Sequence, residues 1–206
     1  MVIDLKRCIG CWSCVIACKI EHGLSPGFFR TYIREREIGE YPAKKIVMPT
    51  HCNHCKNPQC ICPNGATVKR EDGIVYVDPE KCNGCRQCID LCPYGARYYI
   101  DKFREWFPQH ITPYEEVKRK YSKLREGIVD KCDFCVDRVS SGLKRGLKPG
   151  IDRDATPVCV ITCPAKAKYF GDLDDPTSEV SVLISEKRGQ QFDLANTDPS
   201  IYYLLY

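Results

Sequence analysis

The sequence lacks long hydrophobic runs. No apolar stretch approaches the roughly 18 residues that indicate a membrane-spanning helix. The chain opens on Met1-Val2-Ile3-Asp4, and this opening offers neither the apolar segment nor the twin arginine of an export signal. The sequence therefore predicts no membrane span, and it disfavours a secreted protein held together by disulfides.

Charge of one sign and ordinary core residues are also scarce. The 31 Lys and Arg residues nearly balance the 27 Asp and Glu residues, so the formal charge of +4 does not indicate a nucleic-acid partner. Hydrophobic residues make up 43% of the chain, but this fraction includes the cysteines. Without them, about a third of the chain remains for an apolar core. We therefore expect covalent or metal links to stabilise the fold.

Cysteine is the residue that the chain has in excess. Its 206 residues include 16 cysteines, which fall into four groups of four. In chain order, the groups are Cys8, Cys11, Cys14 and Cys18; Cys52, Cys55, Cys60 and Cys62; Cys82, Cys85, Cys88 and Cys92; and Cys132, Cys135, Cys159 and Cys163. The first and third groups have the spacing x2, x2, x3 of bacterial two-cluster ferredoxins. Two such runs in one chain indicate [4Fe-4S] clusters.

The spacing has a physical reason. Cysteines two residues apart on a tight loop can surround the irons of one cubane, and we expect the fourth cysteine to begin a helix and serve a neighbouring cubane. A proline after it, such as Pro93, suits a first helical turn. Gly10 and Gly84 in the loops allow unusual φ angles and a close approach of the backbone to the cluster.

The second and fourth groups depart from this spacing. In the fourth group, 23 residues separate Cys135 from Cys159, although the x3-Cys-Pro ending is intact. In the second group, a single residue separates Cys60 from Cys62, so these two cannot lie one helical turn apart. Either the backbone is rebuilt there or one ligand is displaced.

Zinc and disulfides are the two other uses of so many cysteines. Structural zinc also uses Cys-x2-Cys pairs, but it favours two pairs per site and has no use for the Cys-Pro ending. Disulfides are disfavoured because Cys-x2-Cys loops rarely bridge and no export signal is visible. Four clusters use all sixteen thiolates. Their formal charge of about −8 would be partly offset by the excess of Lys and Arg.

The cysteine groups are nested, because groups two and three lie inside groups one and four. We expect an α+β fold of two nested ferredoxin-like modules with a pseudo-twofold duplication and irregular loops around four clusters. Residues 49–100 form the predicted inner module, and residues 1–48 plus 128–175 form the outer one. A strand is expected at Ile74–Asp78, after a turn.

An internal repeat supports the duplication. The sequence after Cys62 matches the sequence after Cys92, since the first reads Cys62-Pro63-Asn64-Gly65-Ala66 and the second Cys92-Pro93-Tyr94-Gly95-Ala96.

Two further segments are predicted outside the modules. Residues 101–127 form a helical insertion, because Thr112-Pro113-Tyr114-Glu115 is a capping box with proline at the first helical position. Apolar residues recur at helical spacing as far as Leu124, and Gly127 is a plausible stop. We expect this helix to pack on its own protein, with contact to a partner subunit as the alternative. Residues 176–206 form a predicted partner-docking tail, whose aromatic end lies on this protein or on a larger partner.

Together, these motifs resemble a known family, the four-cluster iron–sulfur subunits of molybdopterin oxidoreductases of the dimethyl-sulfoxide-reductase type. The resemblance spans residues 1 to about 180 and is specific to this subunit type. Its matching segments are Cys8-Ile9-Gly10-Cys11, Cys52-Asn53-His54-Cys55, Asp72-Gly73-Ile74-Val75, Cys82-Asn83-Gly84-Cys85-Arg86, Cys92-Pro93-Tyr94-Gly95-Ala96-Arg97, Lys131-Cys132-Asp133-Phe134-Cys135 and Phe170-Gly171-Asp172-Leu173-Asp174-Asp175-Pro176.

The resemblance implies that ligands are exchanged between paired groups. The implied sets are Cys8, Cys11, Cys14 and Cys163 for cluster 1, nearest the catalytic partner; Cys132, Cys135, Cys159 and Cys18 for cluster 2; Cys52, Cys55, Cys60 and Cys92 for cluster 3; and Cys82, Cys85, Cys88 and Cys62 for the distal cluster 4. The short gap before Cys62 departs from the family pattern, but its Cys-Pro segment stays in register with the others.

The resemblance also implies a function. The chain would transfer electrons through four [4Fe-4S] clusters between a large molybdenum- or tungsten-pterin catalytic subunit and an external redox partner or membrane anchor. We expect no catalytic residue, because His22, His51, His54 and His110 form no triad with a cysteine nucleophile. His54 lies inside a cluster loop and is a candidate for tuning that cluster, whereas His51 and His110 are expected to be ordinary residues.

Two other classes of protein compete with this function. A free-standing soluble polyferredoxin is the main alternative, against which stand the aromatic C-terminal segment and the inserted helix. An enzyme with an open iron site is disfavoured, because sixteen cysteines serve four clusters completely. Localisation stays open, since a chain without a signal can remain in the cytoplasm or reach the periplasm folded beside a signal-bearing partner. The substrate and the direction of electron flow also stay open.

Overall fold

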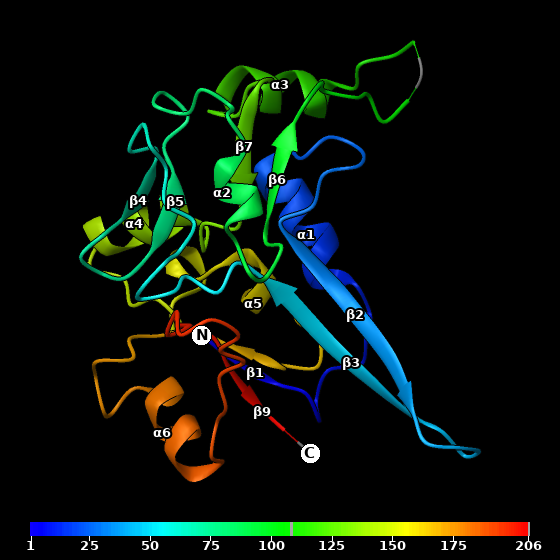
Figure 1. Ribbon diagram of the computed structural model, residues 1–206, viewed down its shortest axis with the longest axis vertical. Helices are drawn as coiled ribbons and strands as arrows, with labels where there is room; N and C mark the ends of the chain where they lie inside the picture. The colour runs from blue at the N-terminus through cyan, green and yellow to red at the C-terminus, as the bar shows by residue number, and fades with distance from the viewer. Residues whose placement is uncertain (108, 206) are drawn as a thin grey trace.

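The computed structural model describes residues 1–107 and 109–205, so Pro108 of the predicted insertion and Tyr206 of the predicted tail lie outside the described residues. Short helices and strands alternate along the chain (Figure 1). The helices are α1 (Ser13–His22), α2 (Gln87–Asp90), α3 (Pro113–Tyr121), α4 (Val136–Lys144), α5 (Val158–Ile161) and α6 (Glu179–Glu186), with a 3₁₀ turn at Arg153–Ala155. The strands are β1 (Val2–Asp4), β2 (Thr31–Ile38), β3 (Lys44–His51), β4 (Thr67–Lys69), β5 (Val75–Val77), β6 (Arg97–Ile100), β7 (Ile128–Lys131), β8 (Lys168–Tyr169) and β9 (Tyr202–Leu204).

None of the helices in the described ranges combines the length and the hydropathy that crossing a bilayer requires. The elements are those of an α+β chain. Their arrangement as two nested ferredoxin-like modules stays a prediction.

A three-stranded sheet brings the two ends of the chain together. Strand β1 lies between β8, which is antiparallel to it, and β9, which is parallel to it. Ile3, Ile201, Tyr203 and Leu204 are buried at this sheet. At these residues the tail therefore lies on its own chain, and a partner-docking role for the rest of residues 176–206 stays a prediction.

A long hairpin of β2 and β3 projects from the body of the molecule (Figure 1). Its base is buried at Ile33 and Val47, but its far half is exposed on both faces, and Tyr41 at the tip is 99% exposed. Sequence reasoning missed this hairpin. The two-residue alternation of a strand depends on one buried face, and here that face is buried only at the base.

Two smaller strand pairs lie in the inner part of the chain. Strands β4 and β5 form a hairpin, and β5 confirms the strand expected at Ile74–Asp78. Strand β6 pairs with β7, which joins the end of the predicted inner module to the start of the second outer segment. The apolar residues of this pair, including Ile100, Ile128 and Val129, pack in one cluster with Cys82 and Cys88.

The helical insertion is confirmed, but its predicted end is wrong. The Thr112 hydroxyl accepts a hydrogen bond from the Glu115 N–H at 3.3 Å, and the Glu115 carboxylate accepts one from the Thr112 N–H at 2.9 Å. Helix α3 ends at Tyr121 rather than near Gly127, because Ser122 is extended and its hydroxyl accepts the Leu124 N–H. Leu124 then packs against the apolar cluster of β6 and β7.

The apolar face of α3 is exposed. Val117 is 54% exposed and Tyr121 is 74% exposed, so the expectation that this face packs on its own protein is wrong for these two residues. Polar contacts hold the helix instead, since the Tyr114 hydroxyl donates to the Ile20 carbonyl and the Lys118 ammonium donates to the Glu21 carbonyl at 2.7 Å. The segment before α3 and the outer side of α1 enclose an apolar cavity of about 250 Å³, lined by Ile16, Lys19, Ile20, Trp106, Phe107, Thr112 and Tyr114.

Candidate metal centres

The loops of the first and third cysteine groups share one backbone form. Gly10 and Gly84 have positive φ angles of 68° and 73°, as the sequence predicts. Trp12 and Arg86, two residues further on, also have positive φ and are followed directly by α1 and α2. Glycine is required most strongly at Gly84, where a Cβ atom would overlap the carbonyl oxygen of Gly127.

In the third and fourth groups a helix precedes the fourth cysteine rather than follows it, and in the first group Cys18 lies within α1. Cys92 comes after α2 and Cys163 comes after α5, and the proline behind each opens a turn. The Cys92 carbonyl accepts the Gly95 N–H at 3.1 Å, and the Cys163 carbonyl accepts the Lys166 N–H at 3.1 Å. The expectation that the fourth cysteine begins a helix is therefore wrong. Proline suits the second position of such a turn because its φ is already fixed.

The second group keeps the turn but has no helix. Residues 52–66, all described, contain neither helix nor strand. A tight turn from the Ile61 N–H to the Gln59 carbonyl at 2.8 Å takes the place of the helix before Cys62. The Cys62 carbonyl then accepts the Gly65 N–H at 3.0 Å, as in the other Cys-Pro turns. The backbone is therefore rebuilt at the short gap, and ligation by Cys62 stays a prediction.

Thiols of the first and fourth groups lie near one another. Burial raises the pKa of Cys8, and the negative charge of Cys163 raises it further. Burial also raises the pKa of Cys132 and of Cys135 well above the ordinary value, and the charge of Cys18 adds to both. Thus the last cysteine of each group lies beside the other group.

Thiols of the second and third groups show the same exchange. Burial raises the pKa of Cys55 to about 11, and the neighbouring charges of Cys60 and Cys92 raise it further. Burial raises the pKa of Cys88, and the charges of Cys60 and Cys62 add to the shift. Cys62 also packs against the apolar cluster that contains Cys82 and Cys88. Cys92 therefore lies beside the second group, and Cys62 lies beside the third.

All sixteen cysteines are described, and all are free thiols. Cys11 and Cys85, the second cysteines of the two ferredoxin-type runs, are the most exposed of them. Among residues 1–107 and 109–205, no three His, Cys, Asp or Glu side chains converge closely enough to hold a single metal ion.

Two buried cations lie among these thiols. Lys168 is 4% exposed, and its Nζ has no hydrogen-bond partner among the described residues. Arg97 is 5% exposed and donates to the Cys60 sulfur at 3.0 Å, while its Nε is also without a partner in the described chain. A buried cation is costly unless an anion is near. Anionic clusters on the surrounding thiolates supply that anion, so the residues present fit [4Fe-4S] clusters.

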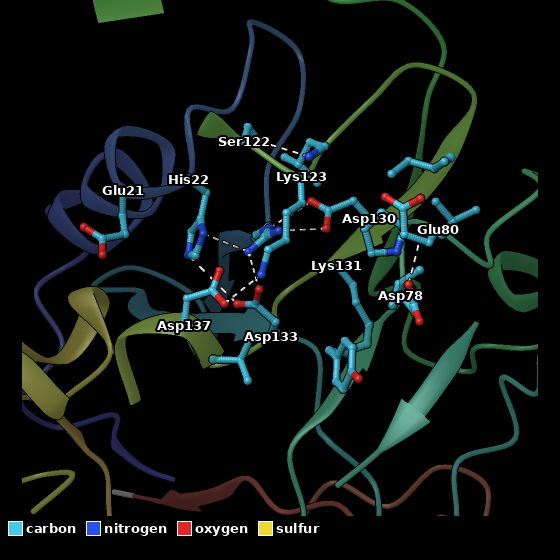
Figure 2. Close-up of a pocket in the computed structure, with 18 of the residues that line it drawn as sticks. Glu21, His22, Asp78, Glu80, Ser122, Lys123, Asp130, Lys131, Asp133 and Asp137 are labelled. Carbon is cyan, nitrogen blue, oxygen red and sulfur yellow. Dashed lines mark hydrogen bonds and ion pairs between the residues drawn. The ribbon is translucent and has the colours of Figure 1, made fainter. Parts of the chain in front are cut away.

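A buried ionic network lies beside Cys132 and Cys135 of the fourth cysteine group. Arg30 donates to both oxygens of Asp130 at 2.8 and 2.9 Å, and its third nitrogen lies 2.9 Å from Asp133. The Tyr98 hydroxyl donates to Asp130 as well. Although burial opposes ionisation of Asp133, the Arg30 charge holds its pKa below the ordinary value. The network forms one wall of a cavity of about 620 Å³, in which Figure 2 shows His22 beside Asp133.

His22 connects this network to Cys135, a predicted cluster ligand. Sequence reasoning missed this contact. The Nδ1 of His22 lies 3.0 Å from the Arg30 guanidinium, and its Nε2 lies 3.3 Å from the Cys135 sulfur. Because arginine only donates, Nδ1 accepts, and Nε2 carries the proton toward Cys135. Burial and the Arg30 charge lower the pKa of His22 to about 4, which keeps the ring neutral. Its place four residues after Cys18 on α1 was the available signal.

His54 joins two cysteine loops by packing. Its ring stacks on Phe134 with centroids 3.5 Å apart, and its Nδ1 accepts the Val75 N–H at 3.0 Å. The neighbouring His51 meets the same ring edge-on. His51 is buried, as expected of a core residue, and a tuning role for His54 stays a prediction.

Comparisons with known proteins agree with the cysteine pattern. Residues 43–109 match the model of a 4Fe-4S dicluster domain, which covers the second and third groups. A subunit of the selenate reductase of Mesobacillus selenatarsenatis is 40% identical over 99% of this chain and 70% of its own. A subunit of the tetrathionate reductase of Salmonella typhimurium is 36% identical over 99% of this chain and 71% of its own. The arsenate respiratory reductase iron–sulfur subunit of Shewanella sp. (strain ANA-3) is 32% identical over 99% of this chain and 94% of its own.

Identity at this level over nearly the whole chain shows the family. The expectation of four [4Fe-4S] clusters, rather than zinc or disulfides, is confirmed by the dicluster match together with the 16 cysteines. The relatives are named as subunits of reductases, which implies a catalytic partner for this chain as well. The chain belongs to the four-cluster iron–sulfur electron-transfer subunits of molybdopterin oxidoreductases.

Proposed function

We propose that each cluster takes three thiolates from one cysteine group and the fourth from the group paired with it. The proposed sets are Cys8, Cys11, Cys14 and Cys163; Cys132, Cys135, Cys159 and Cys18; Cys52, Cys55, Cys60 and Cys92; and Cys82, Cys85, Cys88 and Cys62. The observation that carries the proposal is the placement of the last cysteines. Cys92 lines one cavity with Cys52, Cys55 and Cys60, and Cys62 packs against the apolar cluster that contains Cys82 and Cys88.

The protein provides a hydrogen-bond donor at each of the four proposed sites. A bound [4Fe-4S] cluster supplies one-electron redox chemistry. Backbone N–H groups point at the proposed ligands, since Val129 donates to the Cys82 sulfur at 3.4 Å and Ala167 donates to the Cys163 sulfur at 3.3 Å. Such donors favour the more negative, reduced state. The side chains thereby hold the clusters, exclude water from them and set their potentials.

We propose that the catalytic subunit, which would hold the molybdenum or tungsten pterin, packs on the outer side of α1. That helix carries Cys14 and Cys18 on its buried side, whereas Ile16 and Ile20 are 53% and 56% exposed on the other. Tyr114 at the start of α3 lines one cavity with Ile16 and Ile20 and so extends this surface. An apolar face of this kind on a chain with few apolar residues favours a subunit interface.

We propose that the cluster held by the third group lies at the end of the cluster series opposite to the catalytic subunit. Cys85 is exposed there, as Cys11 is in the first group, so a second partner could approach the cluster of the third group at the surface. That partner would be an external redox protein or a membrane anchor subunit. Electrons could pass along the chain in either direction, depending on the reaction of the catalytic subunit.

The test is anaerobic purification of the native, untagged complex, followed by analysis for iron, molybdenum and tungsten. We expect about sixteen irons per copy of this chain, together with a large subunit that contains molybdenum or tungsten. A stable monomer with about sixteen irons and neither metal would instead identify a free-standing polyferredoxin. About twelve irons would show that Cys62 does not hold a fourth cluster.

A further inference from the structure

The three Cys-Pro turns end on corresponding residues. Each turn is followed by an alanine and then by the first residue of a strand, which is Thr67 in β4, Arg97 in β6 and Lys168 in β8. Two of the three are cations, one in the predicted inner module and one in the outer. Both are almost completely buried, at 5% and 4% exposure, whereas most lysine and arginine side chains in proteins reach water.

Arg97 lies between thiols assigned to two different clusters. Its guanidinium donates to the Cys60 sulfur at 3.0 Å and to the Thr67 hydroxyl at 3.1 Å. The charges that act on it include Cys52 and Cys60, which are proposed for cluster 3, and Cys88, which is proposed for cluster 4. Thr67, the residue at the corresponding place in the other turn of this module, thus holds the cation in position.

Lys168 occupies the corresponding place in the outer module. Burial opposes its charged form, but the charges of Cys159, Cys14 and Cys132 outweigh this and raise its pKa above the ordinary value. Cys14 is proposed for cluster 1, and the other two for cluster 2. The Nζ has no hydrogen-bond partner in the described residues, so this buried ammonium depends on nearby negative charge, which the surrounding thiolates supply first.

We propose that Arg97 and Lys168 are equivalent bridging cations, each placed between the two clusters of one module to raise the potential of both. This inference rests on the proposed ligand sets. A positive charge between two cluster sites stabilises an added electron on either, and this attraction offsets part of the repulsion between electrons on the two. Neither residue would bind iron, so both are positioning residues.

The test replaces each cation in the native complex and measures the four one-electron potentials by EPR-monitored titration. Lys168→Met and Arg97→Met remove the charge and keep much of the side-chain length. Lys168→Arg and Arg97→Lys keep the charge. Lys166→Met is the matched control for the outer module, because Lys166 is an exposed lysine two residues from Lys168. Lys102→Met is the corresponding exposed control near β6.

We expect each Met variant to lower two of the four potentials and leave the other two in place. The equilibrium constant for reduction should fall at least tenfold at each affected cluster, which is about 59 mV for a one-electron couple. The two variants should affect complementary pairs, and the double variant should affect all four. In the charge-conserving variants and in both surface controls, the four potentials should change by only a small fraction of that shift.

The inference is wrong if the iron content is unchanged and no potential moves, or if both Met variants shift the same clusters. A shift confined to one cluster would also overturn it, because a bridging charge acts on two. If Lys168→Met does not assemble, Lys168→Gln is measured in its place, since it keeps a polar end in the same site. Failure of the ligand sets is separate, because it appears as missing iron in the unmodified complex.

Discussion

The second and third cysteine groups end in the same kind of Cys-Pro turn, but the backbone before that turn differs between them. In the third group, α2 contains Cys88 and precedes the turn at Cys92. In the second, Cys60 and Cys62 are one residue apart, and no helix occurs in residues 52–66. Yet both groups end in a Cys-Pro turn closed by a glycine N–H, and a strand begins at the second residue after that glycine. The turn is therefore the constant part, and the helix before it is dispensable.

This difference shows what fixes the direction of the exchanged ligand. A helix would set the position of the last cysteine from its N-terminal side, but in the second group that support is missing. The turn sets it from the C-terminal side, because its proline fixes φ and the alanine after the glycine leads into a paired strand. Ala66 is 1% exposed, which anchors the turn after Cys62 in the apolar cluster with Cys82 and Cys88.

The largest expected effect comes from removing the exchanged ligand in each group. Cys62→Ala should remove the distal cluster, and Cys92→Ala should remove the cluster of the second group, each with a loss of about four irons. Iron analysis and EPR titration of the purified complex measure this, and a different one-electron wave should disappear in each variant. Full iron content in Cys62→Ala, with loss in Cys92→Ala, would show that the shortened gap has displaced the ligand.

A smaller but still severe effect is expected at the third group's loop. Gly84→Ala places a Cβ atom onto the Gly127 carbonyl oxygen at a φ of 73°, so either the loop or the segment before β7 must move. Overpacking and the left-handed backbone together should cost on the order of 3 kcal/mol. Thermal unfolding of the complex, followed by release of iron, measures the change.

Gly73→Ala is the matched control for this experiment. Gly73 has a similar φ of 78°, but a Cβ atom there meets nothing within 4 Å. Its loss of stability should be clearly smaller than that of Gly84→Ala. Equal losses in the two variants would mean that backbone strain alone, and not the contact between the loop and Gly127, explains the need for glycine in the loop.

What the sequence could predict is what depends on neighbours along the chain. The cysteine spacing identifies the ligand groups because cubane loops are local, and the capping box places the start of α3 because Thr112 and Glu115 are three residues apart. The Cys-Pro repeat was visible for the same reason. Its interpretation as the start of a helix was wrong, since proline at the second position of a turn leaves the same signal.

What the sequence could not predict depends on residues far apart. Arg30 pairs with Asp130, 100 positions away, and only the fold shows that His22 lies between this pair and Cys135. The packing of Leu124 against the apolar cluster of β6 and β7, which accompanies the local Ser122 turn that ends α3, is another such contact. Nothing in the sequence distinguishes Lys168 from a surface lysine. Its burial follows from the pairing of β8 with β1.

The smallest expected effect tests the equivalence of the turns most directly. Gly65 and Gly95 have φ angles of 67° and 58°, and a Cβ atom at either would meet nothing within 4 Å. Gly65→Ala and Gly95→Ala should therefore each cost about 1 kcal/mol from the left-handed backbone alone, which lowers the Tm by about 2–4 °C in a domain of this size. The turn after Cys163 offers the reverse change, because Lys166 holds the same position at a φ of 46° without being glycine. Lys166→Gly should leave the Tm unchanged or raise it, since relief of the left-handed strain offsets the added freedom of the unfolded chain. Unequal losses at Gly65 and Gly95 would show that the missing helix does change the turn, and that the second group depends on its neighbours to hold Cys62.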